Sequence, residues 1–202
     1  LFSLTFLLYT PILGGGFLWD DLYLIARNRY LEGWQFLPEI FQSSLYAFAL
    51  EPSNYYRPLQ TVTYLLDRIV FKDAVWGYHL TNLLLHGAVG FLCYCFARRL
   101  RFGGKASFWV ALFFTIHPVH TEAVGYIAGR ADSLSAVFIL TSLLCFHCYL
   151  EKTSFGLYLA SFGAFLLALL SKEIAVVLPI LLLLLLWYEG RKRERAKLLF
   201  PF

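Results

Sequence analysis

The sequence IAVVLPILLLLLLWY at positions 174–188 contains no charged side chain and no regular alternation of polar with apolar residues. The hydrocarbon core of a bilayer offers no water to backbone N–H and C=O groups, so a spanning segment must be a helix or a strand of a closed barrel. Barrel strands alternate polar with apolar residues, and this segment does not. It therefore predicts an α-helical membrane protein.

Five further apolar blocks resemble this one. Of the 202 residues, 59% are hydrophobic and 15% are charged, against about 45–50% and about 25% in soluble domains. Several blocks are shorter than the roughly 20 residues of an ideal span, so tilt or local thinning of the bilayer must make up the difference. We expect an all-α, polytopic transmembrane helix bundle with helices at about 1–13, 78–97, 106–118, 134–149, 155–170 and 174–188.

The chain contains no Met and begins with Leu, which indicates a fragment. The first block lacks a basic n-region and a small-x-small cleavage site, so we expect a membrane helix there and not a signal peptide.

The segment 14–77 between the first two blocks holds prolines, many aromatic residues and charges of both signs. Within 60–71, apolar residues recur at helical spacing, with Asp67 and Arg68 on the other side. This pattern is typical of helices that lie in the membrane interface. The loop shows no apolar pattern large enough for a core of its own, so we expect short interfacial helices and not a separate soluble domain.

The orientation follows from the positions of Lys and Arg. Basic residues follow the blocks at 78–97, 134–149 and 174–188, and these three turns lie on the same side of the membrane. Basic loops face the cytoplasm, and the same pattern accounts for the net charge of +4 without a nucleic-acid partner. The loop 14–77, the segment 117–132 and the turn 171–173 then converge on the lumenal or periplasmic face.

Unusual polar residues gather in these three segments. Asp20 and Asp21 follow the first block and could bind a cation, act as a base or simply be solvated. Arg57 lies among tyrosines, where it could grip a phosphate through two hydrogen bonds or only anchor the loop. His79, Asn82 and His86 are spaced so that they form a polar stripe on one helix face. The stripe could bind a substrate or form hydrogen bonds between packed helices.

The segment 117–122 holds the densest cluster, His117, His120 and Glu122. Its spacing is similar to the zinc motif H-E-x-x-H, but the order differs and Pro118 breaks the helix that the motif needs. Glu122 is the better candidate, as a general acid or base or for positioning a substrate. The C-x-x-C at 145–148 finds no further ligands to complete a tetrahedral zinc site, and we interpret it as packing.

Two more charged pairs complete the set. Arg130 and Asp132 open the fourth block, where Asp132 suits the N-cap or the first turn of a helix. Lys172 and Glu173 separate two very apolar blocks, so each must reach water or a partner.

In order and spacing, these segments resemble the transmembrane and tetratricopeptide repeat-containing (TMTC) proteins and their bacterial relatives. The resemblance covers about 17–188, and its most specific pieces are HPVHTEAV at 117–124 and GRAD at 129–132. It implies that residues 1–202 are the N-terminal part of a GT-C glycosyltransferase domain, with tetratricopeptide repeats downstream of this chain. It further implies transfer of a sugar, mannose in the animal members, from a polyprenyl- or dolichyl-phosphate donor to a hydroxyl acceptor such as protein Ser or Thr.

The same resemblance implies roles for the polar residues. Asp20, Asp21 and Glu122 are the predicted catalytic residues, with Asp20 favoured as base and Asp21 as its support. Some GT-C enzymes use a divalent metal and others do not, so a metal stays open and no protein ligands are predicted for one. The predicted residues for the donor phosphate or substrate are Arg57, His79, Asn82, His86, His117, His120, Arg130, Asp132, Lys172 and Glu173.

Three alternatives remain at this point: GT-C transfer to a lipid or glycan acceptor, a non-catalytic scaffold that presents repeats, and a transporter. A transporter would place ionisable residues near the midplane of the bilayer, between internal repeats, whereas here they gather at one edge. We expect an integral protein of a bacterial inner membrane or the endoplasmic reticulum. Its expected partners are membrane lipid, the lipid-linked donor and a protein or glycan acceptor.

Overall fold

A computed structural model describes residues 2–49 and 53–199. Every regular element in this part of the chain is a helix, which confirms the all-α prediction. The α-helices are α1 Phe2–Tyr9, α2 Leu37–Gln42, α3 Pro58–Phe71, α4 Val75–Arg99, α5 Gly104–Ile116, α6 Thr121–Gly125, α7 Arg130–Lys152, α8 Phe155–Ser171 and α9 Leu178–Leu199. The short 3₁₀ or π segments are η1 Thr10–Gly14, η2 Leu22–Ala26, η3 Arg29–Glu32, η4 Trp34–Phe36, η5 Ala47–Ala49, η6 Pro118–His120, η7 Ile127–Gly129 and η8 Glu173–Val177.

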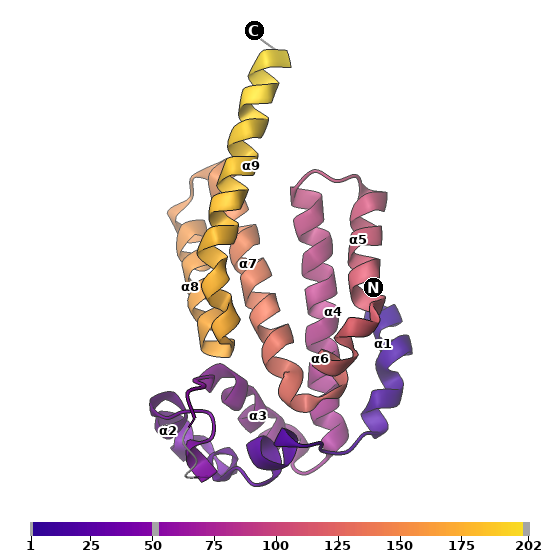
Figure 1. Cartoon of the computed structure of the whole chain (residues 1–202), viewed down its shortest axis with the longest axis vertical. Helices are drawn as coiled ribbons and strands as arrows, with labels where there is room; N and C mark the ends of the chain where they lie inside the picture. The colour runs from indigo at the N-terminus through magenta and orange to yellow at the C-terminus, as the bar shows by residue number, and fades with distance from the viewer. Residues whose placement is uncertain (1, 50–52, 200–202) are drawn as a thin grey trace.

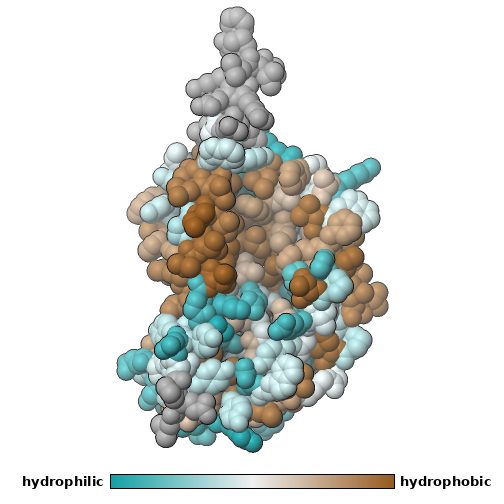
Figure 2. Space-filling model, viewed as in Figure 1, coloured by the Kyte–Doolittle hydropathy of each residue, from teal (hydrophilic) through white to brown (hydrophobic). Residues whose placement is uncertain are grey.

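The helices form a bundle with a cap at one end. Helices α4, α5, α7, α8 and α9 run side by side, and the segment between η1 and α4 folds beneath them, as Figure 1 shows. We call the described residues 15–49 and 53–74 the cap. The face seen in Figure 2 is hydrophobic over the bundle and more hydrophilic over the cap.

Three helical segments in the described chain are long and apolar enough to cross a membrane: Val75–Arg99, Ile127–Lys152 and Glu173–Gly190. Shorter apolar helices occupy Ser3–Gly14, Gly104–Ile116 and Phe155–Ser171. Together with their hydrophobic surface, these segments make the chain an integral membrane protein.

Prolines explain where several helices differ from the predicted bounds. The third block was predicted to run to 118, but α5 ends at Ile116. His117 precedes Pro118 and takes an extended conformation, which the proline ring imposes on its neighbour. At the sixth block, a 3₁₀ turn comes first and α9 begins only at Leu178, with Pro179 in its first turn.

The cap has a hydrophobic core, which its sequence did not lead us to expect. Buried apolar side chains from η2, η3, α2, η5 and α3 form one cluster, and this cluster includes Tyr78 of α4 and Ile127 of η7. Apart from those on α3, most of these apolar residues lie on helical segments of three to six residues, which are too short to show a helical period in the sequence. Because two bundle residues complete the cluster, the cap packs on the bundle and shares its core with it.

Small and hydroxyl side chains bring the bundle helices close together. Ser142 of α7 and Ser161 of α8 exchange hydrogen bonds with each other's carbonyl oxygens at 2.8 and 2.9 Å. Gly90 of α4 faces Thr115 of α5 so closely that an added Cβ would lie 2.5 Å from the threonine hydroxyl oxygen. Contacts of this kind are typical of membrane helix interfaces, where small residues allow backbones to approach.

Candidate active site

A cavity of about 620 Å³ lies where the cap meets the bundle. Its walls come from the cap, from α4 and α5, from the segment 119–129 and from the start of α7, with Lys172 closing one side. The predicted site residues that line it are Asp20, Arg57, His86, His120, Glu122, Asp132 and Lys172. The other predicted residues, which are Asp21, His79, Asn82, His117, Arg130 and Glu173, lie outside the lining.

The two adjacent carboxylates of the cap differ in environment. Asp21 is fully buried and accepts hydrogen bonds from the backbone N–H groups of Leu18, at 3.1 Å, and Ala128, at 2.7 Å. Burial raises the pKa of Asp21, while these backbone donors act in the opposite direction. Asp20 is exposed and faces the cavity. Asp21 therefore fastens the loop to the segment before α7, and Asp20 is the carboxylate that a substrate can reach.

The loop that presents Asp20 is strained. Trp19 has a φ of 42°, a left-handed conformation that is unfavourable for a bulky side chain. The buried Asp21 carboxylate bonds to the N–H of Leu18, and the N–H of Asp21 bonds to the carbonyl of Leu18, so both hold this turn closed. Strained backbone of this kind persists where surrounding contacts over-determine it, and it clusters at functional sites.

Two tyrosines that sequence reasoning missed lie against Asp20. Burial raises the pKa of Tyr46 to about 12, and the charge of Asp20 and a hydrogen bond to it act in the same direction. Burial also raises the pKa of Tyr126, again with a hydrogen bond to Asp20 and its charge. Both phenols line the cavity and remain protonated donors at neutral pH. In the sequence, Tyr126 could have been noticed because it lies shortly after the HPVHTE segment at 117–122, whereas nothing indicated Tyr46.

The two cations of the cavity are each paired with a carboxylate. Arg57 donates from Nε and Nη2 to both oxygens of Glu173, at 2.8–3.1 Å. Its guanidinium also lies 4.8 Å from the ring centroid of Tyr55. Lys172 Nζ lies 2.5 Å from Asp132 Oδ1, in the first turn of α7. The two pairs join the cap, the start of η8 and α7 at one rim of the cavity.

Part of the cavity wall is aromatic. The rings of His86, Phe114 and His120 contact one another, with centroids 4.2–5.6 Å apart. His86 Nε2 lies 3.0 Å from the carbonyl oxygen of Thr115, and His117 accepts the N–H of Val119 as the cap of η6. Burial lowers the pKa of His120, and the neighbouring histidines add to this effect. Both effects favour the neutral form of the His120 imidazole.

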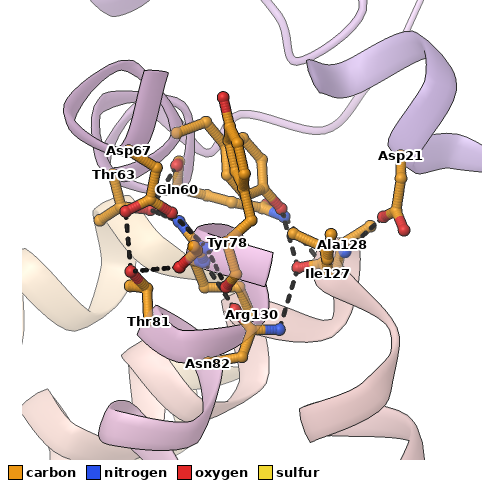
Figure 3. A network of polar contacts seen from close by, with 12 residues as sticks. Asp21, Gln60, Thr63, Asp67, Tyr78, Thr81, Asn82, Ile127, Ala128 and Arg130 are labelled. Atoms are coloured by element: carbon orange, nitrogen blue, oxygen red, sulfur yellow. Dashed lines mark hydrogen bonds and ion pairs between the residues drawn. The ribbon is translucent and has the colours of Figure 1, made fainter. Parts of the chain in front are cut away.

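Arg130 belongs to a buried polar layer, in which Asp67, Tyr78 and Asn82 lie beside it, as Figure 3 shows. Its guanidinium is fully buried, forms an ion pair with Asp67 at 2.6 Å and donates to Asn82 Oδ1 at 2.7 Å. It also donates to the carbonyl of Tyr78 at 2.9 Å and lies 4.7 Å from the ring centroid of Tyr64. These contacts make Arg130 and Asn82 a structural link between α3, α4 and α7.

The position of Asp67 differs from the one expected from the sequence. The helical spacing of α3 placed it on the solvated side of an interfacial helix, but it is buried and pairs with Arg130. Burial raises the pKa of Asp67, and the Arg130 charge and the Thr81 hydroxyl oppose this shift. His79 is buried as well, packed near the backbone of Gly15.

In 2–49 and 53–199, no group of three or more His, Cys, Asp or Glu side chains is arranged to hold a metal ion. The four cysteines in this part of the chain are unbridged.

The family model and the similar proteins agree on one family of membrane glycosyltransferases. Residues 63–201 match the family described as dolichyl-phosphate-mannose-protein mannosyltransferase. Human and mouse Protein O-mannosyl-transferase TMTC2 are each 39% identical over 151 residues, which is 70% of this chain and 18% of theirs. Drosophila melanogaster Protein O-mannosyl-transferase Tmtc2 is 34% identical over 188 residues, 86% of this chain and 20% of the relative. The chain thus spans about a fifth of the length of these relatives, and no solved structure matches it.

Proposed function

The chain belongs to the dolichyl-phosphate-mannose-protein mannosyltransferase family, and on that premise we propose that it forms the catalytic end of a membrane glycosyltransferase. The proposed reaction moves a sugar, mannose as the family's name indicates, from a polyprenyl-phosphate donor to the hydroxyl of a protein Ser or Thr. The relatives' names as protein O-mannosyl-transferases support a protein acceptor.

One observation carries the proposal: a single cavity contains an accessible carboxylate, Asp20, and two cations, Arg57 and Lys172. Transfer to a hydroxyl requires a base for the acceptor proton and positive charge for the departing phosphate. The cavity is lined by Asp132 at the start of α7 and by Lys172 just before the apolar segment Glu173–Gly190, and the phosphate of a lipid-linked donor would be found at such an end of membrane-spanning helices.

In the proposed mechanism the donor phosphate binds at Arg57 and Lys172. The Asp20 carboxylate accepts the proton of the acceptor hydroxyl as its oxygen forms a bond to the anomeric carbon of the sugar. The bond between that carbon and the phosphate oxygen breaks, and the electron pair leaves with the phosphate. The two cations stabilise the negative charge that develops on it.

Asp20 is favoured over Glu122 because of its surroundings. Both carboxylates line the cavity, but only Asp20 has two phenols, those of Tyr46 and Tyr126, whose pKa it helps to raise. A base must be held within hydrogen-bond reach of the proton that it abstracts. Glu122 is the second candidate, for positioning the acceptor.

We further propose that the cap and cavity face the lumen or periplasm. The basic residues Arg98, Arg99, Arg101 and Lys152 lie at the opposite end of the bundle, in the last turns of α4 and α7 and in the loop that follows α4. Such turns face the cytoplasm. The third basic cluster, at 191–197, lies outside the side chains that the structure describes.

The test is transfer by the full-length protein in lipid nanodiscs, from polyprenyl-phosphate mannose to an acceptor polypeptide. Asp20→Asn should reduce the rate by about 10²–10⁴-fold, the usual contribution of a general base. The exposed position and near-identical shape should leave the fold intact. Asp73→Asn is the matched control, since Asp73 is an exposed carboxylate outside the cavity lining, paired with Arg68. Wild-type rates for Asp20→Asn would end the assignment of Asp20 as base.

A further inference from the structure

The cations that line the cavity share one property: each is already engaged by a carboxylate. Arg57 uses the Nε and Nη2 edge of its guanidinium in a two-pronged contact with Glu173. Lys172 contacts Asp132. Lys172 and Glu173 are consecutive in the chain, and the charge of Lys172 also acts on the Glu173 carboxylate. Both pairs therefore belong to one small cluster of charges.

A phosphate cannot simply be added to this cluster. The guanidinium edge that binds a carboxylate in a two-pronged contact is the edge that matches a phosphate. A phosphate that binds Arg57 through that edge must replace Glu173. The same competition holds at Lys172, although an ammonium group has three donors and keeps some free.

The carboxylates and the cations differ in how much free energy they would lose on separating. The side chains of Glu173 and Asp132 are 47% and 52% exposed, so each carboxylate can turn into water. Arg57 and Lys172 are only 16% and 26% exposed, so these cations depend more on an anionic neighbour. Burying a charge without a partner is costly, whereas a solvated carboxylate is not. Exchanging the carboxylate for a phosphate therefore costs less free energy than leaving Arg57 or Lys172 without an anionic partner.

We propose that Glu173 and Asp132 are exchangeable placeholders, which give up Arg57 and Lys172 to the phosphate of a polyprenyl-phosphate lipid. The proposal rests on the proposed function for the identity of the lipid. A lipid-linked phosphate fits better than a free one because Glu173 begins an apolar segment, Glu173–Gly190, that is long enough to span a membrane. Its neighbours Ile174 and Val176 are exposed.

The placeholders also bear on release of the product. A lipid-linked phosphodiester carries one negative charge, and the phosphate monoester left after transfer carries about −1.5 to −2. Two cations without competitors would hold that product more tightly than the donor. Carboxylates that return to Arg57 and Lys172 oppose this tight binding, and turnover depends on them.

The test measures binding and not transfer. A short-chain polyprenyl phosphate, which carries no sugar, is titrated into the full-length protein in nanodiscs of neutral lipid. Glu173→Gln and Asp132→Asn should each bind it about two- to fivefold more tightly, the range expected for half-exposed ion pairs. Arg57→Gln should bind it about tenfold more weakly, as expected for loss of a charged, two-pronged contact. If the pairs were only structural braces, Glu173→Gln would weaken binding, which is the opposite sign.

Two controls match the variants in residue type and pairing. Glu151→Gln removes the partner of Arg99 at 2.9 Å, and Asp73→Asn removes the partner of Arg68 at 2.6 Å. Both pairs lie away from the cavity lining, so both variants should bind the lipid like the wild type.

The remaining measurements separate the ligands. Inorganic phosphate should bind much more weakly than the lipid, and the uncharged polyprenol should show no dependence on Glu173. Unchanged or weaker binding of the lipid phosphate by Glu173→Gln and Asp132→Asn would overturn the proposal. Equal affinity for inorganic phosphate would overturn its lipid component. A protein that binds as expected but transfers no sugar would refute the proposed function and leave this inference standing.

Discussion

Removing Arg130 should destabilise the protein more than any change at the cavity surface. The guanidinium is fully buried and forms an ion pair with Asp67, whose side chain is only 7% exposed. It also donates to Asn82, to the carbonyl of Tyr78 and to Thr63. The variant Arg130→Met keeps much of the volume and removes all of these donors.

The expected magnitude follows from what is left behind. Asp67 would remain buried with Thr81 as its hydrogen-bond donor and with no cation. Breaking a buried ion pair by removing one partner costs about 3–5 kcal/mol. The lost hydrogen bonds are part of the same network, so their cost does not simply add to this figure. We therefore expect Arg130→Met to lower stability by about 3–5 kcal/mol.

A double variant tests this explanation. Replacing a whole buried ion pair with apolar side chains is often neutral or stabilising. Arg130→Met with Asp67→Leu should therefore lose less stability than either single variant, about 1–3 kcal/mol for the carbonyl and amide groups that lose a partner.

The assay is the unfolding midpoint of the full-length protein in mixed detergent micelles, with transfer activity measured in parallel. A loss of less than about 1 kcal/mol for Arg130→Met, or a double variant worse than both single ones, would refute the buried-charge argument. Activity distinguishes the structural role from the donor-binding role that the sequence predicted. A folded double variant that still transfers sugar agrees with the structural role.

Three other outcomes are expected. In a background without the native cysteines, Glu122→Cys should react with an impermeant maleimide from the lumenal or periplasmic side and Lys152→Cys from the cytoplasmic side; the reverse pattern would refute the orientation. Burial lowers the pKa of His120 in the folded protein, so the unfolded chain binds a proton at this residue first as the pH falls below about 6.5. The melting temperature should therefore decline below that pH, and His120→Gln should reduce the decline. Gly90→Ala should cost about 1–3 kcal/mol through the clash with the Thr115 hydroxyl, and Thr115→Ala in the same protein should restore most of the loss; an additive loss in the double variant would contradict the clash.

The apolar blocks predicted the bundle well because the bilayer constrains them so strongly. Helices in lipid must satisfy their own backbone, and a charge within a block is costly, so position and hydropathy suffice to locate them. Orientation by basic turns then brought Asp20, Glu122 and Lys172 to the same end of the bundle, and the structure places all three on one cavity.

The buried polar layer could not be predicted in the same way. Asp67 looks like the solvated face of an amphipathic helix, because the 3.6-residue period indicates a face but not what covers it. Its partner Arg130 lies more than sixty residues away in the chain, on α7. Tyr46 was equally hidden, because its role depends on a turn of the cap that sets it against Asp20. Contacts between distant segments leave no local pattern in a single sequence.

The short segment before α7 joins the polar layer to the proposed base. The carbonyl of Ile127 accepts from Tyr64 and Asn82, and the N–H of Ala128 donates to Asp21. The residue that follows Ile127 thus holds the loop of Asp20 through the Asp21 carboxylate. A shift of this segment would move the base relative to Arg57, which is held separately through Glu173. The position of the proposed base therefore depends on the buried contacts of Ile127 and the part-buried contact of Ala128. The proposed phosphate-binding cations are held instead by carboxylates that are about half exposed. Substitutions in the two sets should therefore affect catalytic rate and lipid affinity separately.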